Sequence, residues 1–301
     1  MKSLLERICS GEVLICDGAM GTQLIARGLQ PGECPESWCT THPDSIREIA
    51  TAYSAAGADI VETNSFGGTS LKLAAYGLES KVGDINRAAA ALAKSGVGER
   101  AYVAGSVGPT GIFVKGEGGR IPASELYDVF KEQVLALAGG GVDAICIETM
   151  WSVQEAEQAI RAAKQNTTLP VLCTFTFSVG PKGFRTAVGV TPENAAKAAR
   201  TAGADIAGAN CGNGVDQMIT IAKQMRASVP DIPLLIQANA GLPVIEHGKA
   251  VYKESPEHMA SRVEELVAAG VNIIGGCCGT TSAHIEAIAR AVRAQVKGVV
   301  F

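Results

Sequence analysis

Short runs of consecutive apolar residues recur along the chain, and most of them are rich in β-branched side chains. The apolar positions are continuous rather than alternating, which is typical of parallel strands that are buried on both faces. Helical patterns separate one run from the next. The pattern therefore predicts eight strands, at residues 13–17, 59–64, 101–106, 143–148, 170–176, 205–211, 232–239 and 272–277.

The helical patterns carry start signals. A capping residue followed three positions later by an acid indicates a capping box, and a capping residue before a proline indicates that the proline opens the helix. These signals predict helix starts at Thr41 and Ser152, with Asp44 and Glu155 as box partners, at Thr191 and Ser255 before prolines, and a further start at Ser124.

One junction between a helix and the next strand occurs four times. In each copy a glycine is followed by an apolar residue, then by Asp or Asn, and then by a strand; the glycines are Gly57, Gly141, Gly203 and Gly270. Glycine at this position ends a helix in the left-handed conformation at no steric cost. The recurrence of this helix-to-strand junction indicates a repeated βα unit.

Eight strands that alternate with helices within 301 residues predict an α/β fold, a closed (β/α)₈ TIM barrel that forms a single domain over residues 1–301. An open Rossmann sheet is the alternative, but no G-x-G-x-x-G sequence follows the first strand. Two glycine-rich stretches, 111–122 and 178–191, are expected to be long loops able to close over a site.

Composition narrows the choice of function. Hydrophobic residues make up 47% of the chain and the formal net charge is −4, with no run of Lys or Arg that would favour nucleic acid or an anionic membrane. No apolar stretch reaches the ~18 residues of a membrane span, and residues 1–12 do not resemble a signal peptide. A cytoplasmic protein is expected.

Polar residues collect where the predicted strands end. Asp17, Asn64, Ser106 and Glu148 close the first four strands, Cys211 closes the sixth, and Cys277 with Cys278 closes the eighth. Active sites of TIM barrels lie at these carboxyl ends. The chemistry is therefore expected at this rim.

The cysteines are the sharpest signal at the rim. The sixth and eighth strands lie close together in a barrel, so Cys211 can meet Cys277 and Cys278. Three thiolates suit tetrahedral zinc, and an open fourth position is the mark of a catalytic site. That position can take a substrate thiol, whose pKa zinc lowers.

Other interpretations of these residues stay open at this stage. The Cys277–Cys278 pair could be a core pair or a vicinal redox pair, and Cys34, Cys39 and His42 could be a second group of ligands. Asp17 and Glu148 could bind a substrate ammonium group or pair with an Arg or Lys of the barrel. Glu62, two residues before its strand ends, is interpreted as structural.

Seven segments together resemble the zinc-dependent homocysteine S-methyltransferase family. They are DGAMGT (17–22), ETNSFGG (62–68), AGSVGPTG (104–111), ET (148–149), GANC (208–211), NAGLP (239–243) and GGCCGT (275–280). The resemblance runs from about residue 10 to residue 295.

The resemblance implies a (β/α)₈ barrel in which Cys211, Cys277 and Cys278 bind zinc and the homocysteine sulfur takes the open position. It also implies that Asp17 and Glu148 hold the ammonium group of homocysteine. The backbone amides of Ala19 and Met20 are candidates for its carboxylate, and Ser106 and Asn64 are weaker candidates for polar contacts.

Members of this family differ in the methyl donor. DGAMGT, GSVGPT and NAGLP are most similar to the homocysteine module of cobalamin-dependent methionine synthase, which implies methylcobalamin, or a separate methyl-corrinoid protein, as donor. The sequence contains no folate, cobalamin or reactivation domain, so it is either a module or a free-standing enzyme. S-methylmethionine, S-adenosylmethionine or betaine as donor, another thiol acceptor, and a non-catalytic zinc or redox sensor are the alternatives.

Overall fold

The computed structural model describes residues 2–246 and 249–298 and confirms the barrel. Eight parallel strands form one sheet in the order β1-β12-β9-β8-β5-β4-β3-β2, and a bridge between Cys16 and Ile60 closes it. The expected domain limits at residues 1 and 301 lie outside the described residues. The strands are β1 (Leu14–Ile15), β2 (Ile60–Glu62), β3 (Tyr102–Val107), β4 (Ala144–Met150), β5 (Val171–Phe175), β8 (Ile206–Asn210), β9 (Leu234–Ala238) and β12 (Ile273–Gly276).

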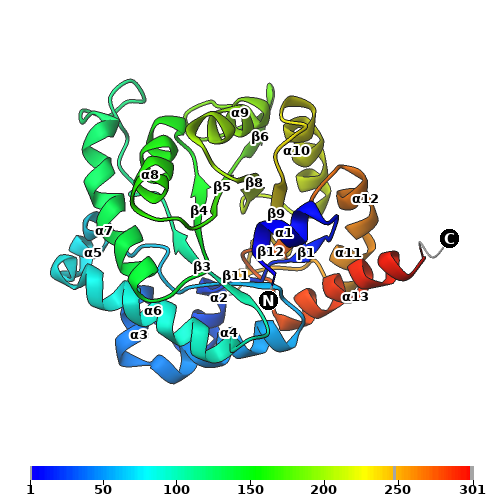
Figure 1. The fold of residues 1–301 in the computed structure, drawn as a ribbon, viewed down its shortest axis with the longest axis horizontal. Helices are drawn as coiled ribbons and strands as arrows, with labels where there is room; N and C mark the ends of the chain where they lie inside the picture. The colour runs from blue at the N-terminus through cyan, green and yellow to red at the C-terminus, as the bar shows by residue number, and fades with distance from the viewer. Residues whose placement is uncertain (1, 247–248, 299–301) are drawn as a thin grey trace.

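A ring of helices surrounds the strands (Figure 1). Each strand is followed by at least one helix of the ring, so the chain consists of eight βα units, as the alternation predicted. The ring helices are α4 (Pro43–Ala55), α6 (Val82–Val97), α7 (Leu126–Gly139), α8 (Val153–Asn166), α9 (Pro192–Ala202), α10 (Val215–Ser228), the pair α11 (Pro256–Ser261) and α12 (Val263–Ala268), and α13 (Ser282–Gly298). Within the described residues, no helix is long and apolar enough to cross a bilayer.

Smaller elements fill the connections. The expected loop at 178–191 contains a hairpin, β6 (Ser178–Gly180) with β7 (Gly183–Arg185), and a second hairpin, β10 (Val244–Glu246) with β11 (Lys249–Val251), follows β9. The other elements are α1 (Leu4–Cys9), α2 (Gly21–Ala26), α3 (Trp38–Thr41), α5 (Ser70–Leu73) and the 3₁₀ turns η1 (Pro35–Ser37), η2 (Ala74–Tyr76), η3 (Glu79–Lys81) and η4 (Ala123–Glu125).

Most of the predicted helix starts are confirmed. Ser152, Thr191 and Ser255 each cap a helix through their side-chain oxygen. The capping box at Thr41 is wrong: α4 begins after His42, and the Thr41 hydroxyl is instead bonded to the carbonyl of Ser37 within the preceding turn. The start expected at Ser124 falls in η4, and the α-helix itself begins at Leu126.

The repeated junction works as expected, and its polar residue has a role of its own. Gly57, Gly141, Gly203 and Gly270 all have left-handed φ values, between 81° and 102°. The Asp or Asn two residues later accepts a hydrogen bond from a backbone N–H of the neighbouring strand. The four bonds are Ile15 N to Asp59 (2.9 Å), Val103 N to Asp143 (2.7 Å), Val171 N to Asp205 (2.7 Å) and Leu234 N to Asn272 (2.9 Å).

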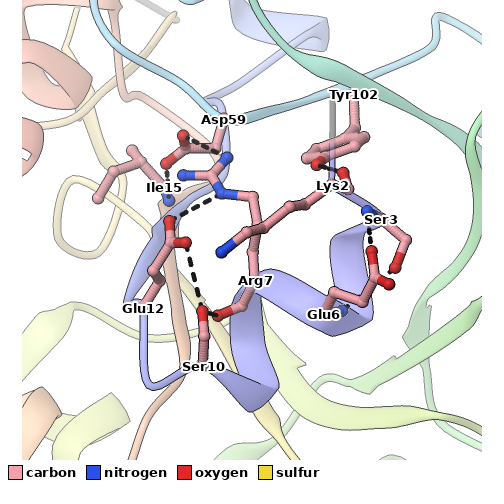
Figure 2. Close-up of polar contacts among 9 residues, drawn as sticks. All are labelled: Lys2, Ser3, Glu6, Arg7, Ser10, Glu12, Ile15, Asp59 and Tyr102. Carbon is pink, nitrogen blue, oxygen red and sulfur yellow. Dashed lines mark hydrogen bonds and ion pairs between the residues drawn. The ribbon is translucent and has the colours of Figure 1, made fainter.

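Helix α1 covers the amino-terminal end of the barrel. Its Leu4 and Ile8 pack into the cluster of side chains that fills the barrel interior. Figure 2 shows how it is fastened: Arg7 forms ion pairs with Glu12 at 2.8 Å and with Asp59 at 2.9 Å. Since this end is filled, the cavity described below opens at the opposite end.

Candidate active site

A cavity of about 360 Å³ lies at the carboxyl ends of the strands. Its lining includes all three candidate cysteines and four carboxylates, those of Asp17, Glu36, Glu62 and Glu148. Among the residues that the structure describes, no Lys, Arg or His lines it. The cavity is therefore suited to cationic groups.

The three sulfur atoms come together as predicted. Cys211 follows β8, Cys277 and Cys278 follow β12, and their Sγ atoms all lie within 4.8 Å of one another, with Cys211 and Cys278 3.6 Å apart. Tetrahedral zinc with Zn–S bonds of ~2.3 Å separates its sulfur ligands by about 3.8 Å. The spacing and the soft donor set therefore fit zinc. All nine cysteines are free thiols, so the pair is not a disulfide here.

The thiol cluster concentrates negative charge on one sulfur. Hydrogen bonds from the thiols of Cys211 and Cys277 lower the pKa of Cys278 to about 3. Hydrogen bonds with Cys211 and Cys278, followed by burial, raise the pKa of Cys277 well above its usual value. A divalent cation would displace the protons of the remaining thiols, because cysteine binds a metal as the thiolate.

Strained backbone accompanies the cluster. Thr149 and Cys211 are the non-glycine residues of the described chain with positive φ, 59° in each case. Such conformations cost free energy and concentrate at functional sites. Asn210 joins the two: its side chain accepts from Thr149 N at 2.8 Å and donates to Thr149 Oγ1 at 2.7 Å.

Thr280 explains two of the glycines beside the cysteines. An added Cβ would lie 2.6 Å from Thr280 Oγ1 at Gly18 and 2.4 Å from it at Gly276. The Thr280 hydroxyl also accepts a hydrogen bond from Ala19 N at 3.1 Å. The DGAMGT turn is thus packed directly on the GGCCGT turn, which requires glycine at position 18, and the GGCCGT turn folds back on itself, which requires glycine at position 276.

Asp17 and Glu148 are both buried and both line the cavity. Asp17 accepts hydrogen bonds from Glu62 N at 2.9 Å and from the Cys16 thiol at 3.6 Å. Burial raises the pKa of Asp17 to about 7 and that of Glu148 to about 8. Since no basic side chain contacts either carboxylate within the described chain, the alternative of an internal ion pair is not supported.

The weaker candidates for substrate contacts differ in the hydrogen bonds that they already make within the chain. Ser106 donates to Glu148 Oε1 and so orients that carboxylate. Asn64 lines the cavity, but its amide nitrogen donates to the carbonyl of Pro35 at 2.8 Å. The amide of Ala19 is engaged by Thr280, whereas Met20 lies where α2 begins, beside the cavity.

Cys34, Cys39 and His42 do not form a second ligand group. Cys39 donates to the carbonyl of Asn64 at 3.3 Å, and the His42 ring stacks on Trp38. Among the described residues, they are not brought together as potential ligands. The buried thiols of Cys34 and Cys39 also have raised pKa values.

Three cavity residues were not singled out as functional from the sequence. Thr149 and Gln237 line the cavity, and so does Glu62, which was interpreted as structural. Glu62 and Gln237 both belong to strands whose apolar runs they interrupt. This interruption is the signal that the sequence offers, but it does not say whether the side chain lines the cavity.

The comparisons with known proteins agree with this geometry. The family model described as homocysteine S-methyltransferase matches residues 14–292. The chain belongs to the homocysteine S-methyltransferase family. The resemblance based on the seven segments is therefore confirmed.

Two curated relatives are the methionine synthases of Mycobacterium tuberculosis and Mycobacterium leprae, each 31% identical over 95% and 96% of this chain. The chain spans about a quarter of the length of these relatives, 25% of each. Among solved structures, the metallated form of the homocysteine methyltransferase MmuM from Escherichia coli matches with a TM-score of 0.77 and 24% identity. That match covers 93% of this chain and 96% of MmuM, and it supports the barrel fold.

Proposed function

We propose that this chain binds zinc through Cys211, Cys277 and Cys278 and transfers a methyl group to the sulfur of homocysteine, forming methionine. The observation that carries the proposal is the meeting of three sulfurs beside a buried anionic cavity. Zinc, when bound, lowers the pKa of the incoming thiol and keeps its sulfur nucleophilic.

The side chains around the cysteines supply recognition of the amino acid. In this proposal Asp17 and Glu148 bind the ammonium group, and each gains a cationic partner when it does so, which offsets the cost of burial. Ser106 and Asn210 orient Glu148 through hydrogen bonds. Holding the acceptor in this way places its sulfur at the cysteine cluster and lowers the entropic cost of meeting the donor.

A methyl-corrinoid, either methylcobalamin or a group carried on a separate corrinoid protein, is the proposed donor. The support is the similarity to methionine synthases, together with the location of the cysteines at the open end of the barrel. S-methylmethionine, S-adenosylmethionine and betaine, the alternatives that the family resemblance leaves open, are the donors to compare.

The test is a parallel assay of the zinc-loaded chain with homocysteine and each donor. Methionine formed from methylcobalamin or a methyl-corrinoid protein, and not from the other donors, is the expected result. Turnover with another donor alone would remove the corrinoid from the proposal. Zinc binding without methyl transfer to any thiol would favour the sensor alternative.

A further inference from the structure

Besides Asp17 and Glu148, the cavity contains the carboxylate of Glu62, which has no role in the proposed function. Ile60 and Glu62 are the inward-facing residues of β2; Ile60 packs in the barrel interior and Glu62 lines the cavity above it. Glu62 Oε2 accepts a hydrogen bond from Gln237 Nε2 at 3.2 Å. Its Oε1 atom is buried and has no well-formed hydrogen bond among the described residues, although the Cys146 thiol lies near this carboxylate.

Among the described residues, Gln237 also has a side-chain oxygen without a hydrogen-bond donor. Its side chain is 2% exposed, it lines the cavity, and its Oε1 atom has no partner in the described chain. Two residues with an unpaired, buried side-chain acceptor, one on β2 and one on β9, therefore line the same cavity. Buried acceptors without donors cost free energy, so both indicate a ligand that donates hydrogen bonds.

The charge of the surroundings indicates that this donor is a cation. Carboxylate oxygens of Asp17 and Glu62 lie within 4.8 Å of each other, and no basic side chain lines the cavity in the described residues. Burial, followed by the charge of Asp17, raises the pKa of Glu62 to about 7. A cation that lies between two neighbouring carboxylates favours the ionised form of both.

We propose that Glu62, held in place by Gln237, binds the α-ammonium group of the acceptor together with Asp17 and so makes the site select amino thiols over thiols without an amino group. This inference rests on the proposed function, because it takes the acceptor to be homocysteine. It adds Glu62 and Gln237 to the residues that determine specificity.

A second metal ion held by Cys16, Asp17 and Glu62 is the rival occupant, since their ligand atoms also lie within 4.8 Å of one another. Cys16 argues against it. Its thiol is fully buried and donates its proton in a hydrogen bond to Asp17 at 3.6 Å, so it is already engaged within the chain.

The test compares two ligands that differ only in the amino group. L-Homocysteine and 4-mercaptobutanoate are titrated calorimetrically, under reducing conditions, into the zinc-loaded wild-type chain and its Glu62→Gln variant. We expect homocysteine to bind the variant about 10- to 100-fold more weakly, while the affinity for 4-mercaptobutanoate changes less than about twofold.

Glu155→Gln is the matched control. Glu155 is also buried, but its oxygens accept from Thr110 and Trp151 and it does not line the cavity. Its ligand preference should equal that of the wild type. Glu62→Asp, which keeps the charge, should retain part of the preference, and it serves as the test if Glu62→Gln fails to fold.

Equal weakening of both ligands, or of neither, in Glu62→Gln would overturn the inference while leaving the proposed function intact. Two zinc equivalents in the wild type and one in the variant would assign Glu62 to a metal instead. A zinc-loaded wild type that does not bind homocysteine at all would overturn both proposals.

Discussion

Asn210 donates a hydrogen bond to Glu148, with 3.1 Å between Asn210 Nδ2 and Glu148 Oε2. Because Asn210 immediately precedes Cys211, this contact joins the proposed ammonium site to the proposed zinc site. The same side chain fixes Thr149 in its strained conformation. One asparagine thus sets the relative position of the two halves of the site.

Replacing Asn210 with alanine should therefore impair acceptor binding while zinc is retained. Loss of a hydrogen bond to a charged group costs about 1.5–3 kcal/mol, so the KM for homocysteine should rise about 10- to 100-fold. Steady-state kinetics and metal analysis check this. Asn194→Ala, at an exposed position on α9, is the control. An unchanged KM in Asn210→Ala would show that Glu148 does not need this support.

Cys278→Ala should abolish zinc retention and methyl transfer while the barrel stays folded. The reason is that two remaining sulfurs hold zinc far less tightly than three. Metal analysis after gel filtration and circular dichroism are the measurements, with Cys9→Ser, an exposed cysteine, as the control. Full zinc occupancy in Cys278→Ala would remove this residue from the ligand set.

Glu148→Gln should weaken homocysteine binding much more than zinc binding. The carboxylate lies against Ser106 and Asn210 rather than in the sulfur cluster, so its charge acts on the ammonium group. We expect a loss of affinity of about 10- to 100-fold for homocysteine, with about one zinc retained per chain. Equal loss of both ligands would indicate a structural role for Glu148.

The buried carboxylates also predict how binding depends on pH. Burial raises the pKa of Asp17 to about 7 and of Glu148 to about 8, and the ammonium group of homocysteine binds their ionised forms. Affinity for homocysteine should therefore rise between pH 6 and pH 8.5, measured by calorimetry on the zinc-loaded chain. Glu148→Gln should flatten the rise, and a wild-type affinity independent of pH would contradict the assignment.

The stability of the ligand-free chain should change in the opposite direction. Each of these folded-state pKa values is higher than in the unfolded chain, so the folded state binds more protons between about pH 4 and pH 8. The free energy of unfolding therefore falls as pH rises through this window. Urea denaturation at pH 5 and pH 8, with and without homocysteine, should show the loss and its partial reversal by the ligand.

Much of the fold is readable from the sequence because its signals are local. The continuous apolar runs located all eight strands, and the four glycines located the helix ends. The strand limits differ at the ends: β1 is only Leu14–Ile15, whereas β4 runs on to Met150 with a shift of register after Ile147. The capping box at Thr41 failed because a competing turn, α3, uses that hydroxyl.

The candidate site could likewise be predicted from the sequence only in part. The convergence of Cys211 with Cys277 and Cys278 follows from strand order, which the repeat predicts. The place of Glu62 does not, because a two-residue offset from a strand end does not say whether a side chain lines the cavity. Nor does the sequence show that Asn64 and the Ala19 amide are already engaged by Pro35 and Thr280.

Helix α1 occupies the end of the barrel opposite the cysteines, with Leu4 and Ile8 inserted among the interior side chains. Ligands therefore reach the cavity through the opening at the carboxyl ends of the strands. In the proposed reaction, an acceptor bound against the inner carboxylates enters before a bulky methyl carrier covers that opening, and the methylated product leaves after the carrier. Filling one end of the barrel would thus impose a compulsory order of binding and release at the other.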